Sequence, residues 1–267
     1  MKKGTILIIV SALLMLSLAL SSSVKAYGKI SAGQEYFELR IYHITGKSQE
    51  SRMDAYLKDA YLPALHRAGI PAIGVFKPVE SDTSSGKLIY VFIPFKTIDQ
   101  YAKLPEMLGK DKVYEEAGKS FIDAAYNDPP FARYESIFMK AFSDMPQCAV
   151  PSFTTPANER IYELRSYESA TEAKAAKKIE MFNQGGEIKL FSQLGFNAVF
   201  YGEVLVGSHK PNLMYMTSFS DKASNETHWK DFGAHPIWKK LSAMEEYKNT
   251  VSKLYSYLLH PTSYSDF

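Results

Sequence analysis

The sequence has a single cysteine, Cys148, among its 267 residues. One cysteine cannot form an intramolecular disulfide, so the fold must be stabilised by packing even in an oxidising compartment. The chain also lacks a glycine-rich phosphate loop, a Gly-x-Ser-x-Gly nucleophile elbow and a cysteine–histidine pair. If the protein is an enzyme, these absences favour cofactor-free chemistry on an organic substrate.

The chain also has little net charge, with 31 Lys and Arg against 29 Asp and Glu. Removing the first 26 residues would take away Lys2, Lys3 and Lys25 and no acidic residue. A near-neutral chain offers no electrostatic footprint for nucleic acid or for an anionic membrane. We therefore expect neither nucleic acid binding nor stable membrane insertion.

Residues 1–26 have the pattern of a secretory signal peptide. Lys2 and Lys3 precede an apolar run over residues 5–20, and small residues lead to a cleavage point after Ala26. The run is shorter than the roughly 18–20 residues of a stable transmembrane helix. The mature chain is therefore predicted to be exported, either to the periplasm or out of the cell.

One short pattern occurs twice and organises the rest of the chain. Residues 36–42 read Tyr-Phe-Glu-Leu-Arg-Ile-Tyr, and residues 161–167 read Ile-Tyr-Glu-Leu-Arg-Ser-Tyr. At the same offset, Leu-Ile-Tyr-Val at 88–91 returns as Leu-Met-Tyr-Met at 213–216. A constant offset between similar segments indicates an internal duplication.

Each copy reads as β-α-β-β-α-β, the ferredoxin-like order, which makes the fold class α+β. The first domain is placed at 27–145, a proline-containing linker at 146–158 and the second domain at 159–267. The main expected elements are helices over 49–67 and 171–194, a helical region that starts over 97–103 and continues over 110–126, a helical region from 222, and strands over 73–77, 87–95, 131–141, 198–205, 213–220 and 254–259.

Two features interrupt the predicted helices. Pro63 should kink the helix over 49–67, because proline lacks an N–H and clashes with the preceding turn. Gly185 and Gly186 in the helix over 171–194 each cost about 1 kcal/mol of helix stability. Adjacent glycines therefore imply a kink, or a close approach by a backbone or a ligand.

The second copy contains an ordered set of four motifs: Tyr-Glu-Leu-Arg-x-Tyr at 162–167, Leu-Gly-Phe at 194–196, His-Pro-x-Trp at 235–238 and Leu-His-Pro-Thr-Ser-Tyr-Ser at 259–265. With these motifs the second copy resembles the NIPSNAP family, and the first copy matches less well because it lacks the tryptophans. The resemblance implies a dimeric α/β-barrel fold in which two ferredoxin-like sheets close face to face, here from one chain. That superfamily includes monooxygenases, isomerases and haem enzymes, whereas the NIPSNAP family itself implies no established reaction.

Apolar side chains alternate with Glu, Arg and Tyr side chains in both copies of the repeated strand, so each set occupies one face. We expect the apolar set to pack on helices and barrel closure to turn the Glu-Arg-Tyr set inward. There it forms either an ion-paired core or the lining of a pocket. A buried Arg165 needs a counter-charge, which Glu163, Glu187 or a ligand anion would supply.

The helical region from 222 holds two histidines and both tryptophans of the chain. His228 and His235 are two helical turns apart, but Gly233 and Pro236 argue against one straight helix. No further metal-ligand spacing accompanies them, so no metal and no cofactor are predicted. The two tryptophans suit either core packing or the wall of an apolar ligand site.

The candidate ligand-binding residues all lie in the second copy, and His228 and Glu187 are also candidate proton carriers. The leading hypothesis is a small, partly apolar ligand bound between sheet and helices. A cofactor-independent monooxygenase- or isomerase-like enzyme and an interaction module with a filled barrel remain alternatives, and a homo-oligomer remains open. The full candidate set is Glu163, Arg165, Tyr167, Glu187, Tyr201, His228, Trp229, His235 and Trp238.

Overall fold

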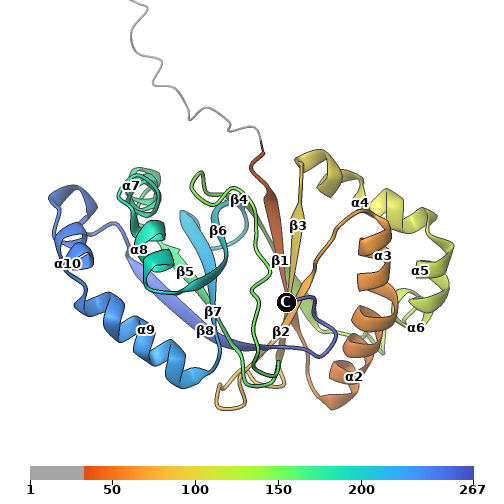
Figure 1. Ribbon diagram of the computed structural model, residues 1–267. Helices are drawn as coiled ribbons and strands as arrows, with labels where there is room; N and C mark the ends of the chain where they lie inside the picture. The colour runs from red at the N-terminus through yellow and green to blue at the C-terminus, as the bar shows by residue number, and fades with distance from the viewer. Residues whose placement is uncertain (1–32) are drawn as a thin grey trace, which may run out of the picture. The chain divides into compact units, whose positions relative to one another are not determined.

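The computed structural model describes residues 33–267, so the predicted signal peptide lies outside the described residues. Eight antiparallel strands close into one barrel, with helices on its two outer sides (Figure 1). The strands are β1 (Tyr36–His43), β2 (Gly74–Pro78), β3 (Leu88–Phe95), β4 (Arg133–Ala141), β5 (Ile161–Glu168), β6 (Asn197–Val206), β7 (Asn212–Phe219) and β8 (Lys253–Pro261).

The order of the strands shows the duplication directly. The barrel runs β1-β3-β2-β8-β5-β7-β6-β4, so each half has the ferredoxin-like sheet order: β4-β1-β3-β2 in the first and β8-β5-β7-β6 in the second. The two sheets join through β2–β8 and β4–β6 pairs. One chain supplies both sheets, which confirms the predicted fold class.

The predicted orientation of the repeated strand is wrong. Phe37 and Leu39 lie inside the barrel in a cluster with Phe200 and Leu164, whereas Tyr42 packs among helix residues. The Glu-Arg-Tyr rows therefore face the helices. An eight-stranded barrel is just wide enough to be filled by apolar side chains, and the sheet–helix layer accommodates longer polar side chains with their partners.

The helices of the first half cover one side of the barrel and those of the second half the other (Figure 1). Within residues 33–267, no helix has the length and apolar character needed to cross a bilayer. The helical elements are α2 (Lys47–Tyr56), the π-helical turn η1 (Leu57–Tyr61), α3 (Leu62–Arg67), α4 (Ile98–Lys110), α5 (Lys112–Ala117), α6 (Lys119–Ile122), α7 (Glu172–Phe182), α8 (Glu187–Gln193), α9 (Lys222–Ala234), α10 (Pro236–Ser242) and the 3-10 turn η2 (Glu245–Tyr247).

The structure confirms both predicted helix interruptions. The π-helical turn η1 ends two residues before Pro63, where the helix must adapt to a missing N–H. The helix is interrupted at Gly186, between α7 and α8. The φ of Gly186 is 84°, a left-handed conformation that glycine adopts more easily than other residues. A Cβ added to Gly185 would lie 2.5 Å from the carbonyl oxygen of Met181, so the break also depends on close backbone contact.

The C-terminal tail fastens β8 to the first half. The backbone N–H groups of Ile73 and Val75 donate to the side chains of Asp266 and Ser265. Phe267 is buried, and its ring packs against the interior ring of Phe92. The tail therefore adds to the barrel core and ties the second half to the first.

Replacing Phe267 by Ala is expected to lower the free energy of unfolding by about 3–5 kcal/mol, the usual loss for a buried aromatic ring. Urea unfolding of the full chain measures the change. Tyr126→Ala is the matched control, since Tyr126 is 98% exposed and its loss should change stability by no more than about 0.5 kcal/mol. Equal losses for both variants would contradict a packing role for the tail.

Candidate functional site

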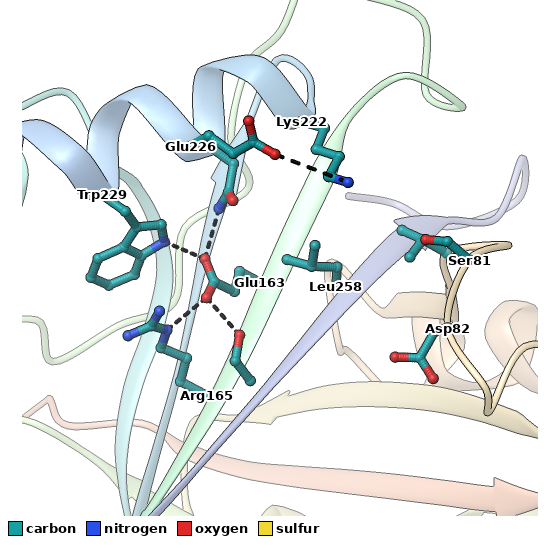
Figure 2. A pocket seen from close by; sticks show the side chains of 11 residues that line it. Ser81, Asp82, Glu163, Arg165, Lys222, Glu226, Trp229 and Leu258 are labelled. Atoms are coloured by element: carbon teal, nitrogen blue, oxygen red, sulfur yellow. Dashed lines mark hydrogen bonds and ion pairs between the residues drawn. The ribbon is translucent and has the colours of Figure 1, made fainter.

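A cavity of about 630 Å³ lies between the sheet and α9 in the second half. Figure 2 shows Trp229, Glu163 and Arg165 meeting at one end, with Leu258 and the loop after β2 across from them. The wall comes from β5, β8, α9 and that loop, and it comprises Val79, Ser81, Asp82, Glu163, Arg165, Lys222, Asn225, Glu226, Trp229, Ser256 and Leu258.

The carboxylate of Glu163 is buried and accepts hydrogen bonds from four donors. Its Oε1 accepts from Arg165 Nε and from Ser256 Oγ, both at 2.6 Å. Its Oε2 accepts from Asn225 Nδ2 at 2.7 Å and from Trp229 Nε1. These donors come from β5, β8 and α9, so one charge holds three elements together.

The environment keeps Glu163 ionised. Burial alone would raise the pKa of Glu163, but the charge of Arg165 and the hydrogen bonds from Ser256, Arg165 and Asn225 outweigh it, so the pKa lies below its usual range. A carboxylate that is ionised and fully engaged is a poor general base. Glu163 therefore serves to position its neighbours.

Arg165 lines the cavity and is fixed on three sides. Its Nε binds Glu163, its Nη1 donates to the hydroxyl of Tyr167 at 3.1 Å, and its guanidinium carbon lies 3.6 Å from the ring centroid of Trp229. Within residues 33–267, no group accepts a hydrogen bond from Nη2. The free edge of a rigid guanidinium is suited to an oxygen acceptor on a ligand.

A second polar layer lies behind Arg165, away from the cavity. The hydroxyls of Tyr167 and Tyr215 are 2.7 Å apart, and the carboxylate of Glu187 accepts from Lys178 Nζ at 2.7 Å with both side chains buried. Burial raises the pKa of Glu187, while the charges of Lys178 and Arg165 oppose the rise. Tyr167 thus connects to the cavity through Arg165, whereas Glu187 does not reach the cavity wall.

The other predicted residues lie outside the cavity wall. His228 packs on Phe196 and Phe219, with Nδ1 2.7 Å from the carbonyl oxygen of Ser224. His235 caps the start of α10, since its Nδ1 accepts from the backbone N–H of Ile237. The break between α9 and α10 at His235 confirms that no single helix carries both histidines.

Tyr201 and Trp238 also pack against other side chains and do not line the cavity. The ring of Tyr201 is fully buried beside Tyr215 and Phe182. Trp238 packs on Phe232 and lies 5.5 Å from Lys178 Nζ. Of the nine predicted residues, Glu163, Arg165 and Trp229 line the cavity, and Tyr167 supports them from behind.

Sequence reasoning missed six polar residues of the wall. Asn225 and Ser256 bind Glu163 directly. The other four are Ser81, Asp82, Lys222 and Glu226 (Figure 2). Asn225 had a detectable signal, because it precedes Trp229 by one helical turn. Ser256 had none, since only the β5–β8 register places it opposite Arg165.

The first half contains the same sheet pair without its helix partners. Arg40 Nε lies 2.9 Å from Glu38 Oε1, which also accepts from Ser136 Oγ at 2.6 Å. In the described part of the chain, no donor reaches the buried Oε2 of Glu38. The donors from α9, Asn225 and Trp229, therefore distinguish the Glu-Arg pair of the second half, which lines the cavity, from that of the first half.

Residues 162–266 match the NIPSNAP family model. The second half of the chain is a NIPSNAP domain. The match includes Glu163, Arg165, Asn225 and Trp229, so the cavity wall lies largely within it. No curated protein sequence matches the chain significantly.

Solved structures resemble the whole barrel. A putative monooxygenase from Fusobacterium nucleatum has a TM-score of 0.56 at 8% identity, covering 86% of this chain and 94% of its own. One from Lactobacillus acidophilus has a TM-score of 0.54 at 10% identity, covering 85% and 94%. An anthrone oxidase-like protein has a TM-score of 0.50 at 10% identity, covering 87% and 94%. At such identities the likeness concerns the fold alone.

The internal repeat provides a matched pair of substitutions. Glu163→Gln places an amide group against donors and leaves Arg165 without its counter-charge, so it should cost about 3 kcal/mol or more. Glu38→Gln should cost distinctly less, because an amide N–H₂ can occupy the position of the donor-free Oε2. Urea unfolding of both full-chain variants at pH 7 measures the difference.

The cost of Glu163→Gln should also depend on pH. A carboxylate whose pKa is lowered in the folded state stabilises the protein above its unfolded pKa of about 4.3, and this contribution is lost as pH falls through the folded pKa. The gap between wild type and variant should therefore shrink below about pH 4. A gap that stays constant from pH 7 to pH 3 would contradict an ionised, donor-saturated Glu163.

Proposed function

We propose that this NIPSNAP-domain protein binds a small, partly apolar molecule bearing a carboxylate or carbonyl oxygen in the cavity beside Arg165. The observation that carries the proposal is a rigid guanidinium edge without an acceptor at the wall of a 630 Å³ cavity. A volume of this size is within the range of small-molecule sites, roughly 300–1,000 Å³.

Two parts of the wall bear on the proposed ligand, and Asp82, Lys222 and Glu226 form a further part of mixed charge. Trp229, Leu258 and Val79 offer apolar surface, and Arg165 offers hydrogen-bond donors next to the tryptophan. A ligand with an apolar body and one oxygen acceptor would engage both parts at once. Glu163 would not compete for the ligand, because its two oxygens already accept from four donors.

The geometry favours binding over acid–base catalysis. His228 lies outside the cavity wall, and Glu187 is committed to Lys178. The likeness to putative monooxygenases is a likeness of fold, and fold alone does not carry an activity. The barrel interior holds a continuous cluster of large side chains, so the sheet–helix cavity is the better place for a ligand.

Native mass spectrometry of the mature protein purified from its own host tests the proposal. The wild type should carry a reproducible bound mass that denaturation releases. Arg165→Gln should lose it, because the charged donors are gone. Since that change also disturbs Glu163, Ser81→Trp provides a second test: it fills the cavity from an exposed loop position and leaves the Glu163 contacts intact.

Trp238→Phe is the control, since Trp238 does not line the cavity. It should retain the bound mass in the same proportion as wild type. A wild-type protein without any bound mass, or equal loss in Ser81→Trp and Trp238→Phe, would contradict the proposed site.

We further propose that the chain is exported, on the basis of the lysine-led apolar run and small residues within positions 1–26. The exported protein should have the intact mass of a chain that starts at Tyr27. Leu14→Arg, which puts a charge into the apolar run, should block processing, whereas Leu14→Val should leave it unchanged. An exported protein that still carries residues 1–26 would overturn the cleavage.

A further inference from the structure

A separate recess of about 210 Å³ opens at one end of the barrel. It shares no lining residue with the cavity beside Arg165. Its wall comes from the inward-facing side chains of several strands and from the loop before β7. The lining comprises Ile41, Leu88, Tyr90, Glu135, Ile137, Ser166, Glu168, Ser208, His209, Asn212, Met214, Tyr255 and Tyr257.

The recess is acidic, because its lining contains two carboxylates and neither lysine nor arginine. Glu135 lies 2.7 Å from Nε2 of His43, and Glu168 lies 3.3 Å from Nδ1 of His209. The Oε1 of Glu168 that faces His209 is buried and forms no hydrogen bond within residues 33–267. Two carboxylates in one recess lined by neither lysine nor arginine are suited to a positively charged donor.

Three tyrosines line the same recess as these carboxylates. The rings of Tyr255 and Tyr257 are nearly parallel with centroids 6.2 Å apart, and Tyr90 lies 6.2 Å from Tyr257. Burial, together with Tyr255 and the carboxylates Glu135 and Glu168, raises the pKa of Tyr257, so its ring remains a neutral phenol. Neutral aromatic faces attract cations held within about 6 Å.

The structure already contains one ammonium group at this rim. Lys253, at the start of β8, places its Nζ 4.8 Å from the ring centroid of Tyr255. The side chain is anchored outside the recess, so it occupies one aromatic face without filling the volume. This cation–π contact at the rim is of the same kind as the contact that a free cation would make deeper in the recess.

We propose that this end of the barrel binds a small alkylammonium ion, with its charge between Glu135 and Glu168 and its alkyl part among Tyr90, Tyr257 and Met214. An organic cation fits better than a metal ion, because the described residues contain no group of three or more His, Cys, Asp or Glu side chains able to hold one. Much of the recess wall is also aromatic or aliphatic carbon, which contacts alkyl groups favourably.

Ligand-observed NMR on the full chain, with butylammonium chloride as the probe and 1-butanol as its neutral counterpart, tests the proposal. Butylammonium should bind at least tenfold more tightly than butanol in the same buffer. Glu168→Gln should weaken butylammonium binding at least tenfold. Lys253→Met should strengthen it severalfold, because a competing ammonium is removed from the rim.

Glu203→Gln provides the matched control at an exposed position of β6 outside the recess, and it should leave the Kd unchanged. Arg165→Gln should also leave it unchanged, which separates this site from the proposed ligand cavity. Equal affinity for butanol and butylammonium, equal weakening by Glu168→Gln and Glu203→Gln, or no gain in Lys253→Met would each overturn the proposal. The opposite sign expected for Lys253→Met keeps the test decisive even if Glu168→Gln is poorly folded.

Discussion

The second half of the molecule depends on one buried charge, the carboxylate of Glu163. Removing such a group from water is costly unless nearby donors and an opposite charge replace the lost hydration. Here Arg165 supplies the charge, and β8 and α9 supply the remaining donors. The carboxylate thereby sets how closely α9 approaches the sheet, and the cavity lies directly beside this contact.

The duplicated sheet shows which part of this arrangement is shared and which part is specific. Both halves retain a glutamate, an arginine two residues later and a serine on the neighbouring strand. These partners follow from strand alternation and register alone. The difference comes from the helix layer: α9 contributes Asn225 and Trp229, whereas the residue that α4 buries is Leu104. Over the Glu-Arg pair, the two halves therefore differ in the helix side chains that cover a shared pattern of sheet residues.

The sequence predicted the duplication and the element order, because period-two alternation and a constant offset are local signals, and the resemblance to the NIPSNAP family implied the barrel. The sequence also predicted Glu163 as one of three possible partners of Arg165, beside Glu187 and a ligand anion, and the structure pairs Arg165 with Glu163. The prediction of which strand face points into the barrel was wrong. Both faces of a helix-covered barrel are buried, so the alternation of side chains alone cannot distinguish them. The same limit hid Ser256, whose position depends on pairing between strands some ninety residues apart. His228 and Trp238 were predicted in the site because they are near Trp229 in sequence. In the structure His228 packs on Phe196 and Phe219. Trp238 lies in the next helix, beyond the break at His235.

The two recesses differ in the sign of the charge that remains available, and this follows from how each carboxylate is satisfied. Glu163 is saturated by four donors, so the group left to act on a ligand is the cationic edge of Arg165. Within residues 33–267 the Oε1 of Glu168 has His209 Nδ1 3.3 Å away but forms no hydrogen bond, so the group available at that end is a carboxylate. A glutamate in a barrel strand can therefore favour anionic or cationic ligands, depending on whether the protein itself supplies its donors. In this fold the helices supply donors only on the outer face of the sheet, so the outer cavity is left with a cationic edge and the barrel end with an anionic one.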